Sequence, residues 1–180
     1  SFDSDGYTLG ADGTSNSNGD ATVSWNWKAN GTGSSNTDGT ITSTVSANTT
    51  AGFSIIKYTG TGATATVGHG LNAIPDMMII KRYSDAGEQW TIYHKSLGNT
   101  KYMQLHSSGT GGTSATRWNN TSPTSTLFTV NTPAATAGSF EKISARSFCL
   151  LVFIPQKIPA VVKPGIWNPR FVVIFFMINI

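Results

Sequence analysis

Hydrophobic and polar residues alternate along most of residues 1–138 with the two-residue period of a β-strand. Between residues 21 and 29, Val23, Trp25 and Trp27 share one face, while small polar residues and a lysine occupy the other. The same alternation, or a short apolar run, recurs in residues 37–47, 52–60, 75–83, 89–97, 101–106 and 126–131. This pattern predicts a succession of short strands.

Turn-forming residues separate these segments. An Asp-Gly pair at 38–39 indicates a tight turn, and the Gly- and Ser-rich residues 31–39 and 107–116 are predicted loops. No window combines sustained helical spacing with capping residues. Short strands at intervals of about 8–12 residues favour an all-β fold, and specifically an antiparallel β-sandwich or jelly-roll-like domain.

Composition narrows the class of protein. Only 12% of residues are charged, while 38% are apolar and 11% aromatic, which favours a packed domain over a disordered chain. The polar surface must come from Thr, Ser, Asn and Gly, as is typical of β-rich secreted or virion surface proteins. The net charge is +3, but no Lys/Arg cluster is interleaved with aromatics, so nucleic acid is not a predicted partner. Cys149 is the single cysteine, and no Cys/His spacing indicates zinc.

The chain changes character near residue 139. Eighteen of the nineteen glycines and every threonine lie in residues 1–138, and an apolar, proline-interrupted tail follows. A membrane-spanning helix needs ~20 mostly apolar residues, and four prolines divide the tail into shorter pieces, so no span is predicted. Two interpretations remain: hydrophobic strands of a real domain, or translation in a wrong reading frame. We favour the second, because so apolar a tail would need something to bury it.

A faint internal repeat suggests the domain organisation. The step Phe128-Thr129-Val130 repeats the aromatic-Thr-aliphatic opening of residues 7–9. We therefore expect residues 1–29 to be the closing strands of a preceding repeat and residues 30–51 to be a linker. Residues 52–138 are then the main β-sandwich repeat, truncated, and residues 139–180 are the apolar tail.

A series of sequence blocks carries a resemblance to a known family. The blocks are "SFDSDGYTLG" and "VSWNWKA", then "GFSIIKYTGTGATATVGHGLNAIPDMMIIKR", "QWTIYHKSLGNTKYMQL" and "RWNNTSPTSTLFTV". In this order they resemble a repeat domain of unknown function found in tail and tail-fibre-like proteins of bacteriophages, many of them marine. The resemblance covers about residues 1–138. It implies a β-rich, non-enzymatic virion component in an oligomeric tail assembly, and it supplies no catalytic residues.

The chain departs from that family after Gly138. The family continues there with an alternating aromatic strand, whereas this chain has "SFEKISARSFCLL". Loss of that strand would leave a neighbouring strand with an open edge and part of the core uncovered.

Aromatic and amide side chains in a predicted loop are the candidate ligand site. Trp118 lies within "RWNNTSPTS", where it could stack on a sugar ring, while Arg117, Asn119 and Asn120 could donate hydrogen bonds to a glycan. The alternative interpretation of a tryptophan in an alternating β protein is a core side chain.

Histidine and acidic residues offer weaker chemistry. His69, between two glycines, is interpreted as a turn residue that hydrogen-bonds local backbone rather than as a base or metal ligand. The Asx-rich stretches 3–6, 16–20 and 36–39 resemble parts of a calcium loop, but none carries the full pattern with its closing Glu. We therefore predict no metal site and no cofactor.

These observations together predict a structural or receptor-contacting component of a phage tail or tail fibre, located in the virion and forming a homo-oligomer. Its loops would contact a bacterial surface glycan. The alternative is a secreted bacterial adhesin or carbohydrate-binding module at the cell surface. A tail-associated glycosidase is less favoured, and the protein is not predicted to be an enzyme, because neither a nucleophile elbow nor a phosphate loop is present.

Overall fold

A computed structural model describes residues 7–11, 13, 16–19, 21, 27, 29–82, 90–105, 111–131 and 147–153, the last of these as backbone. The chain divides into two compact units. One comprises residues 1–27 and 158–179, and the other comprises residues 28–157 with residue 180. All the strands described below belong to the second unit.

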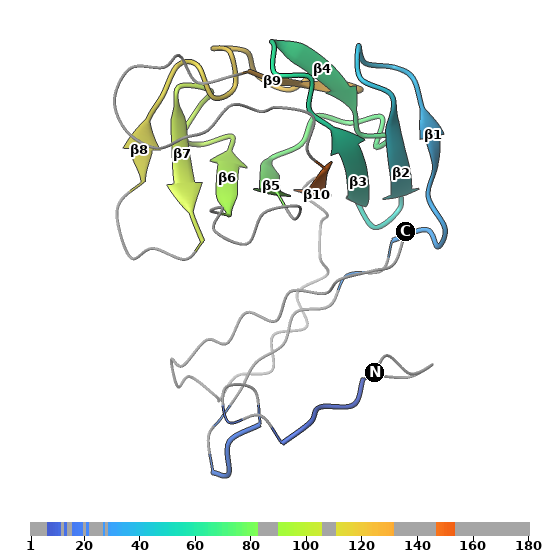
Figure 1. Ribbon diagram of the computed structural model, residues 1–180, viewed down its shortest axis with the longest axis vertical. Coiled ribbons are helices and arrows are strands. Elements are labelled where there is room, and N and C mark those ends of the chain that lie inside the picture. The colour runs from blue at the N-terminus through green and yellow to red at the C-terminus, as the bar shows by residue number, and fades with distance from the viewer. Residues whose placement is uncertain are drawn as a thin grey trace. The chain divides into compact units, whose positions relative to one another are not determined.

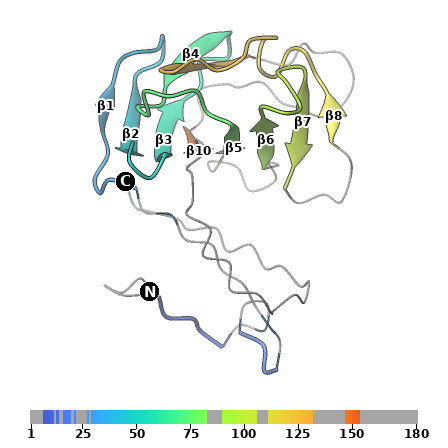
Figure 2. The ribbon, with the colours of Figure 1, turned by 180° about the vertical axis from the view of Figure 1, so that it is seen from behind.

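Most of the strand residues of the second unit belong to one antiparallel sheet. Eight strands lie in the spatial order β1–β2–β3–β10–β5–β6–β7–β8, as Figures 1 and 2 show from opposite sides. Two further strands, β4 and β9, pair with each other in a second sheet. The strand bounds in chain order are β1 Ser34–Asn36, β2 Ser43–Asn48, β3 Phe53–Thr59, β4 Ala65–Gly68, β5 Met77–Arg82, β6 Thr91–His94, β7 Lys101–Gln104, β8 Gly112–Thr113, β9 Leu127–Val130 and β10 Ser147–Phe153.

The two sheets enclose the main core. Val67 of β4 and Phe128 of β9 are buried, and the Phe128 ring meets Tyr58 of β3 edge to face, with ring centroids 6.0 Å apart. Alternation explains this arrangement, because every second residue of β4 and β9 points inward while the residues between them are partly exposed. The prediction of an all-β, antiparallel fold is therefore confirmed. The buried core cluster is Ile41, Val45, Ile56, Tyr58, Ala65, Val67, Leu71, Met78, Tyr93, Trp118, Phe128 and Val130.

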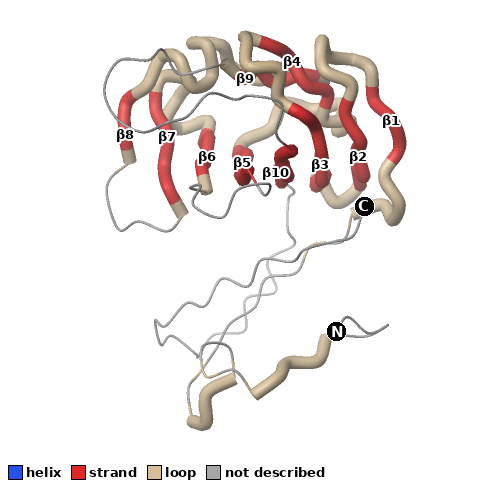
Figure 3. The backbone as a smooth tube through the Cα atoms, in the orientation of Figure 1, coloured by secondary structure: helices blue, strands red, loops and turns tan. Residues whose placement is uncertain are grey.

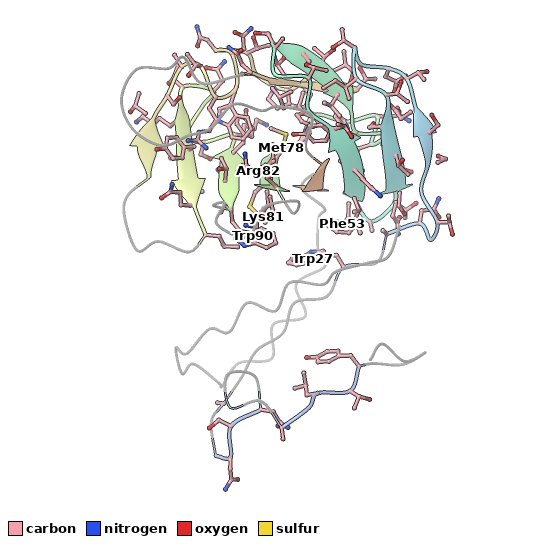
Figure 4. All side chains as sticks on the ribbon, viewed as in Figure 1. Trp27, Phe53, Met78, Lys81, Arg82 and Trp90 are labelled. Atoms are coloured by element: carbon pink, nitrogen blue, oxygen red, sulfur yellow. The ribbon has the colours of Figure 1, made fainter. Side chains whose placement is uncertain are left out.

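The central strands are buried on both faces of the large sheet. In β3, Ile56 belongs to the main core cluster, while the preceding Ile55 is buried outside that cluster. In β5, Met78 belongs to the main core cluster, while Ile79 is buried outside it. Figure 4 shows Met78 on one side of the sheet and Lys81 with Trp90 on the other. Burial on both faces explains why these strands read as continuous apolar runs instead of alternating ones.

β10 corrects the expectation that the β structure ends near Gly138. Residues 147–153 pair along their whole length with β3 on one side, and residues 148–153 pair with β5 on the other. Figure 3 shows β10 between these two strands. The physical reason is that β3 and β5 have no direct ladder with each other, so an apolar segment from farther along the chain completes the sheet. Residues 154–180 lie outside the described residues.

β1 and β2 correct the expectation that residues 30–51 are a linker. Their composition is polar, yet Ser43 and Ser46 of β2 are buried because their hydroxyls find backbone acceptors. Ser43 Oγ donates to the Gly68 carbonyl at 3.3 Å, and Ser46 Oγ donates to the Gly31 carbonyl at 2.7 Å. Serine with a satisfied hydroxyl can replace an apolar residue on a buried face, and that hid the strand pattern. Most of residues 1–29, the predicted closing strands, lie outside the described residues.

Within the described part of the chain, no helix has the length and apolar character needed to cross a membrane.

Candidate functional site

The candidate loop contains two successive tight turns. The Asn120 N–H donates to the Ala115 carbonyl at 2.7 Å, and the Asn119 N–H donates to the Thr116 carbonyl at 3.1 Å. This pair of bonds is the pattern of a Schellman turn, and it places Asn119 in the left-handed region at φ 51°. The next bond, from Thr121 N–H to the Trp118 carbonyl, closes a type I′ turn with Asn120 at φ 47°. Asparagine tolerates this region, so the Asn-Asn pair has a structural explanation.

The structure places Trp118 in the core rather than on the surface. Its side chain is 2% exposed, and its Nε1–H donates to the Lys101 carbonyl at 3.0 Å. Its ring meets Tyr93 of β6 edge to face, with centroids 5.6 Å apart. The suggestion that Trp118 stacks on a sugar ring is therefore corrected. The ring fills space over β6, and the indole N–H satisfies a backbone carbonyl.

Arg117 is held in a fixed position beside Trp118. The guanidinium carbon lies 3.8 Å from the centroid of the Tyr102 ring, and Nη1 donates to Thr91 Oγ1 at 2.8 Å. Burial lowers the pKa of Arg117 from its ordinary value, while Tyr102 acts in the opposite direction. The side chain remains partly exposed. A stacked, hydrogen-bonded guanidinium is a preorganised donor for an oxygen-rich ligand.

A chain of polar side chains connects the loop to the small sheet. Asn131 Nδ2 donates to Asn119 Oδ1 at 3.0 Å, and Thr64 Oγ1 donates to Asn131 Oδ1 at 2.6 Å. Thr64 precedes β4 and Asn131 follows β9, so this chain fixes the Asn-Asn turn against the ends of both strands. Asn119 and Asn120 are both exposed.

The turn between β6 and β7 lies next to the same loop. Asn99 Nδ2 donates to Ser122 Oγ at 3.1 Å. In the same turn, Lys95 Nζ lies 3.2 Å from Asp76 Oδ1, and the lysine side chain is mostly exposed whereas the aspartate side chain is only 30% exposed. We give the name amide surface to the polar groups of the loop residues Arg117, Asn119 and Asn120 together with Asn131 and Thr64. It offers hydroxyl, amide and guanidinium groups, which suit hydroxyl-bearing ligands.

Sequence reasoning missed Thr91, Tyr102, Thr64 and Asn131. Tyr102 and Thr91 alternate with apolar residues in their strands, which indicated only which face they occupy. The one signal in the sequence was the glycine at position 112. In the structure, a Cβ on Gly112 would lie 2.6 Å from two atoms of the Tyr102 ring. A glycine opposite an aromatic residue often marks close ring-to-backbone packing.

His69 acts as a turn residue, as the sequence suggested. It is fully buried, and its Nδ1 accepts the Leu71 N–H at 3.2 Å. That acceptor role places the proton on Nε2, which donates to the Thr124 carbonyl at 3.2 Å. Burial lowers the pKa of His69 below its ordinary value, against smaller opposing effects from the Thr124 carbonyl and Asp38. The imidazole is therefore neutral at physiological pH, and it joins two loops.

The Asx-rich stretch at 36–39 forms a turn of its own. The Asp38 N–H donates to Asn36 Oδ1 at 3.2 Å, and Asn36 Nδ2 donates to Asp38 Oδ2 at 2.9 Å. In the stretch at 16–20, Asn16 Nδ2 donates to the Gly10 carbonyl at 2.8 Å, while residues 3–6 lie outside the described residues. Among the described side chains, no group of three His, Cys, Asp or Glu residues is placed to hold a metal ion.

Comparison with known proteins gives one finding. Neither the search of curated proteins nor the search of solved structures returned a match. A family profile, in contrast, matches residues 1–148, which span most of the chain and end inside β10. The chain therefore belongs to the family described as Domain of unknown function (DUF7483).

Proposed function

We propose that the chain is a structural, receptor-contacting component of a phage tail or tail fibre, which presents the amide surface to glycans on a bacterial cell. The observation that carries this proposal is the amide surface itself. Its exposed amides and partly exposed guanidinium are held by turns and by stacking, on an all-β scaffold. The sequence resemblance to phage tail repeat domains supplies the biological setting.

Preorganisation is the physical basis of the proposed contact. Arg117 already stacks on Tyr102 and donates to Thr91, so a ligand would not have to immobilise that long side chain. Asn119 and Asn120 are fixed by backbone bonds in the same way. Each hydrogen bond to a sugar contributes little by itself, and a tail assembly would multiply weak contacts through multivalency.

The exposed amide of Asn120 allows a clean test of the binding surface. In Asn120→Gly the backbone keeps its positive φ without strain, so the variant loses only the side-chain amide. We expect the full chain to bind immobilised bacterial surface polysaccharides, and the variant to bind about 5-fold more weakly, as for one lost hydrogen bond. The matched control is Gly10→Ala, where an added Cβ meets nothing within 4 Å. Equal binding by Asn120→Gly and the control would remove the amide surface from the proposal.

The main alternative is a secreted bacterial adhesin or carbohydrate-binding module, which would use the same surface. Immunogold electron microscopy with antibodies to the full chain separates the two, applied to viral and cellular fractions of the source sample. Gold on phage tails supports the proposal, whereas gold on bacterial envelopes favours the adhesin. Release of reducing sugar from a bound polysaccharide would instead indicate the less favoured glycosidase.

A further inference from the structure

The strand order leaves a place in the middle of the large sheet that only a distant segment fills. β3 and β5 each have a neighbour on their outer side, β2 and β6, and both leave their inner side to β10. We call the position between β3 and β5 the central slot. It offers seven register positions on the β3 side, from Phe53 to Thr59, and six on the β5 side, from Met77 to Arg82.

The outer edges of the sheet are poor places for another chain to pair. β1 has three residues, of which Ser34 and Ser35 are exposed, and β8 has only two, Gly112 and Thr113. Short, polar edge strands of this kind limit edge-to-edge association. The central slot is the opposite, since it is long, lies between apolar strands and forms backbone bonds on both sides of any strand that enters it.

The hydrogen bonds in the central slot do not depend on which copy of the chain supplies β10. Both ladders are seen here with Ser147–Phe153 of the same chain, and the identical segment of a second copy carries the same backbone donors and acceptors. Residues 132–146 separate β9 from β10, and a connection of about 15 residues can span about 50 Å when extended. The tether favours the same chain by giving its β10 an effective concentration, which for short connections is about millimolar.

We propose that copies of this chain exchange β10, so that the central slot of one copy binds Ser147–Phe153 of a second copy. Local concentrations above millimolar, as between chains held side by side, would favour the exchanged form by mass action. This is strand addition inside a sheet rather than at its edge, and domain swapping is a low-cost route to such assembly. The inference goes beyond the proposed function and does not rest on glycan binding.

Cys149 makes the exchange measurable. It lies opposite Lys57 of β3 and Lys81 of β5. Because a strand residue directs its N–H and C=O to the same side, Cys149 forms a hydrogen-bonded pair with one of these partners and a non-hydrogen-bonded pair with the other. Cα separations of about 4.5–5.5 Å in such pairs fit a disulfide. Full-length Lys57→Cys and Lys81→Cys therefore each put a second cysteine at a register position opposite Cys149.

In the experiment, each variant is prepared with two different tags. The two forms are mixed, unfolded, refolded together at micromolar to about millimolar concentration, oxidised, and analysed on non-reducing gels. We expect a covalent dimer that carries both tags, and we expect its share to rise with concentration to about half near millimolar. Purely intrachain disulfides at every concentration would overturn the proposal. Failure of both variants to form a disulfide would overturn the β10 register and the proposal with it.

The matched control repeats each lysine-to-cysteine change in a Cys149→Ser background. We expect covalent dimers to disappear there, because residue 149 no longer supplies a thiol. Dimers that persist would arise from a contact unrelated to β10, and they would also overturn the proposal.

Discussion

One face of the large sheet is covered in two different ways. Over β3 the cover is regular, because β4 and β9 form a two-stranded sheet that inserts Val67 and Phe128. Over β6 and β7 the cover is the irregular loop of residues 114–122, which inserts Trp118 and lays Arg117 on Tyr102. The two covers share one core cluster.

The two covers differ in how their polar groups find hydrogen-bond partners. The regular cover places its backbone groups in a ladder and needs only alternating side chains. The loop lacks a ladder, so it relies on tight turns, the indole N–H of Trp118 and the stacked guanidinium of Arg117. A loop cover of this kind exposes fixed polar groups, and three residues of the amide surface, Arg117, Asn119 and Asn120, belong to it.

Replacing one buried aromatic residue of each cover by alanine tests whether the two covers contribute equally to the free energy of unfolding. Trp118→Ala and Phe128→Ala each leave a cavity among fully buried side chains, and we expect each to lower the free energy of unfolding by about 3–5 kcal/mol. Denaturant unfolding of the full chain measures both. A loss below about 1 kcal/mol for Trp118→Ala would mean that packing of the loop against the core contributes little to stability.

Trp118→Phe sharpens the same comparison. It keeps an aromatic ring but removes the donor to the Lys101 carbonyl, and we expect a loss of about 1–3 kcal/mol for the unsatisfied group. The corresponding conservative change in the regular cover, Phe128→Leu, affects no hydrogen bond of its side chain.

Two glycines test how closely the regular cover approaches the adjoining segment. A Cβ on Gly39 would lie 2.7 Å from the Thr66 carbonyl carbon, and a Cβ on Gly68 would lie 2.7 Å from Asn36 Cγ. We expect Gly39→Ala to cost about 1–3 kcal/mol, because the obstructing atoms belong to backbone. Gly68→Ala should cost less, since the partly exposed Asn36 side chain can turn away with the loss of its bonds to Asp38, whereas backbone cannot move aside. Thermal unfolding of both, with Gly10→Ala as control, measures the order.

The link between His69 and the loop before β9 should depend on pH. Because burial holds the pKa of His69 below its ordinary value in the folded state, the unfolded chain binds the proton more readily. The stabilisation is complete above the unfolded value of about 6.5, and it is lost as the pH falls from there towards the lower folded-state pKa. We expect the free energy of unfolding to decrease as the pH falls through this interval. In His69→Gln this component of the pH dependence should disappear, and its persistence would assign it to another group.

The smallest effect belongs to the Asn-Asn turn of the loop cover. Asn120→Ala places a residue with a Cβ at φ 47°, and we expect a cost of about 1 kcal/mol. Asn120→Gly should change stability by less than about 0.5 kcal/mol, because glycine adopts the same conformation freely. If both variants unfold alike, the left-handed backbone is not what holds this turn.

Much of the fold could be predicted from the sequence because alternation is a local property. Residues 126–131 and 101–106 alternate, and they contain β9 and β7. Residues 30–51 were misjudged because Ser43 and Ser46 occupy buried positions that a polarity pattern treats as exposed. β10 was missed for a different reason. Its position depends on pairing with residues 66 to 100 positions away, from Phe148 with Arg82 to Phe153 with Phe53, and composition alone does not record such pairing.

The candidate site likewise has local features that the sequence predicts and long-range features that it does not. "RWNNT" could be recognised as a loop, and its Asn residues do adopt the left-handed conformations that this residue type tolerates. The inward direction of Trp118 could not be predicted, because it depends on the position of Tyr93 and the Lys101 carbonyl in three dimensions. The roles of Thr64 and Asn131 likewise require β4 and β9 to be paired first.

The central position of β10 also sets the order in which the protein can fold during its synthesis. At about 5–20 residues per second, the ribosome completes Ser147–Phe153 roughly 4–20 seconds after β3. Through that interval β3 and β5 present unpaired edges between apolar residues, a combination that invites aggregation. The nascent chain is therefore prone to aggregation until β10, the last strand among the described residues, pairs with β3 and β5.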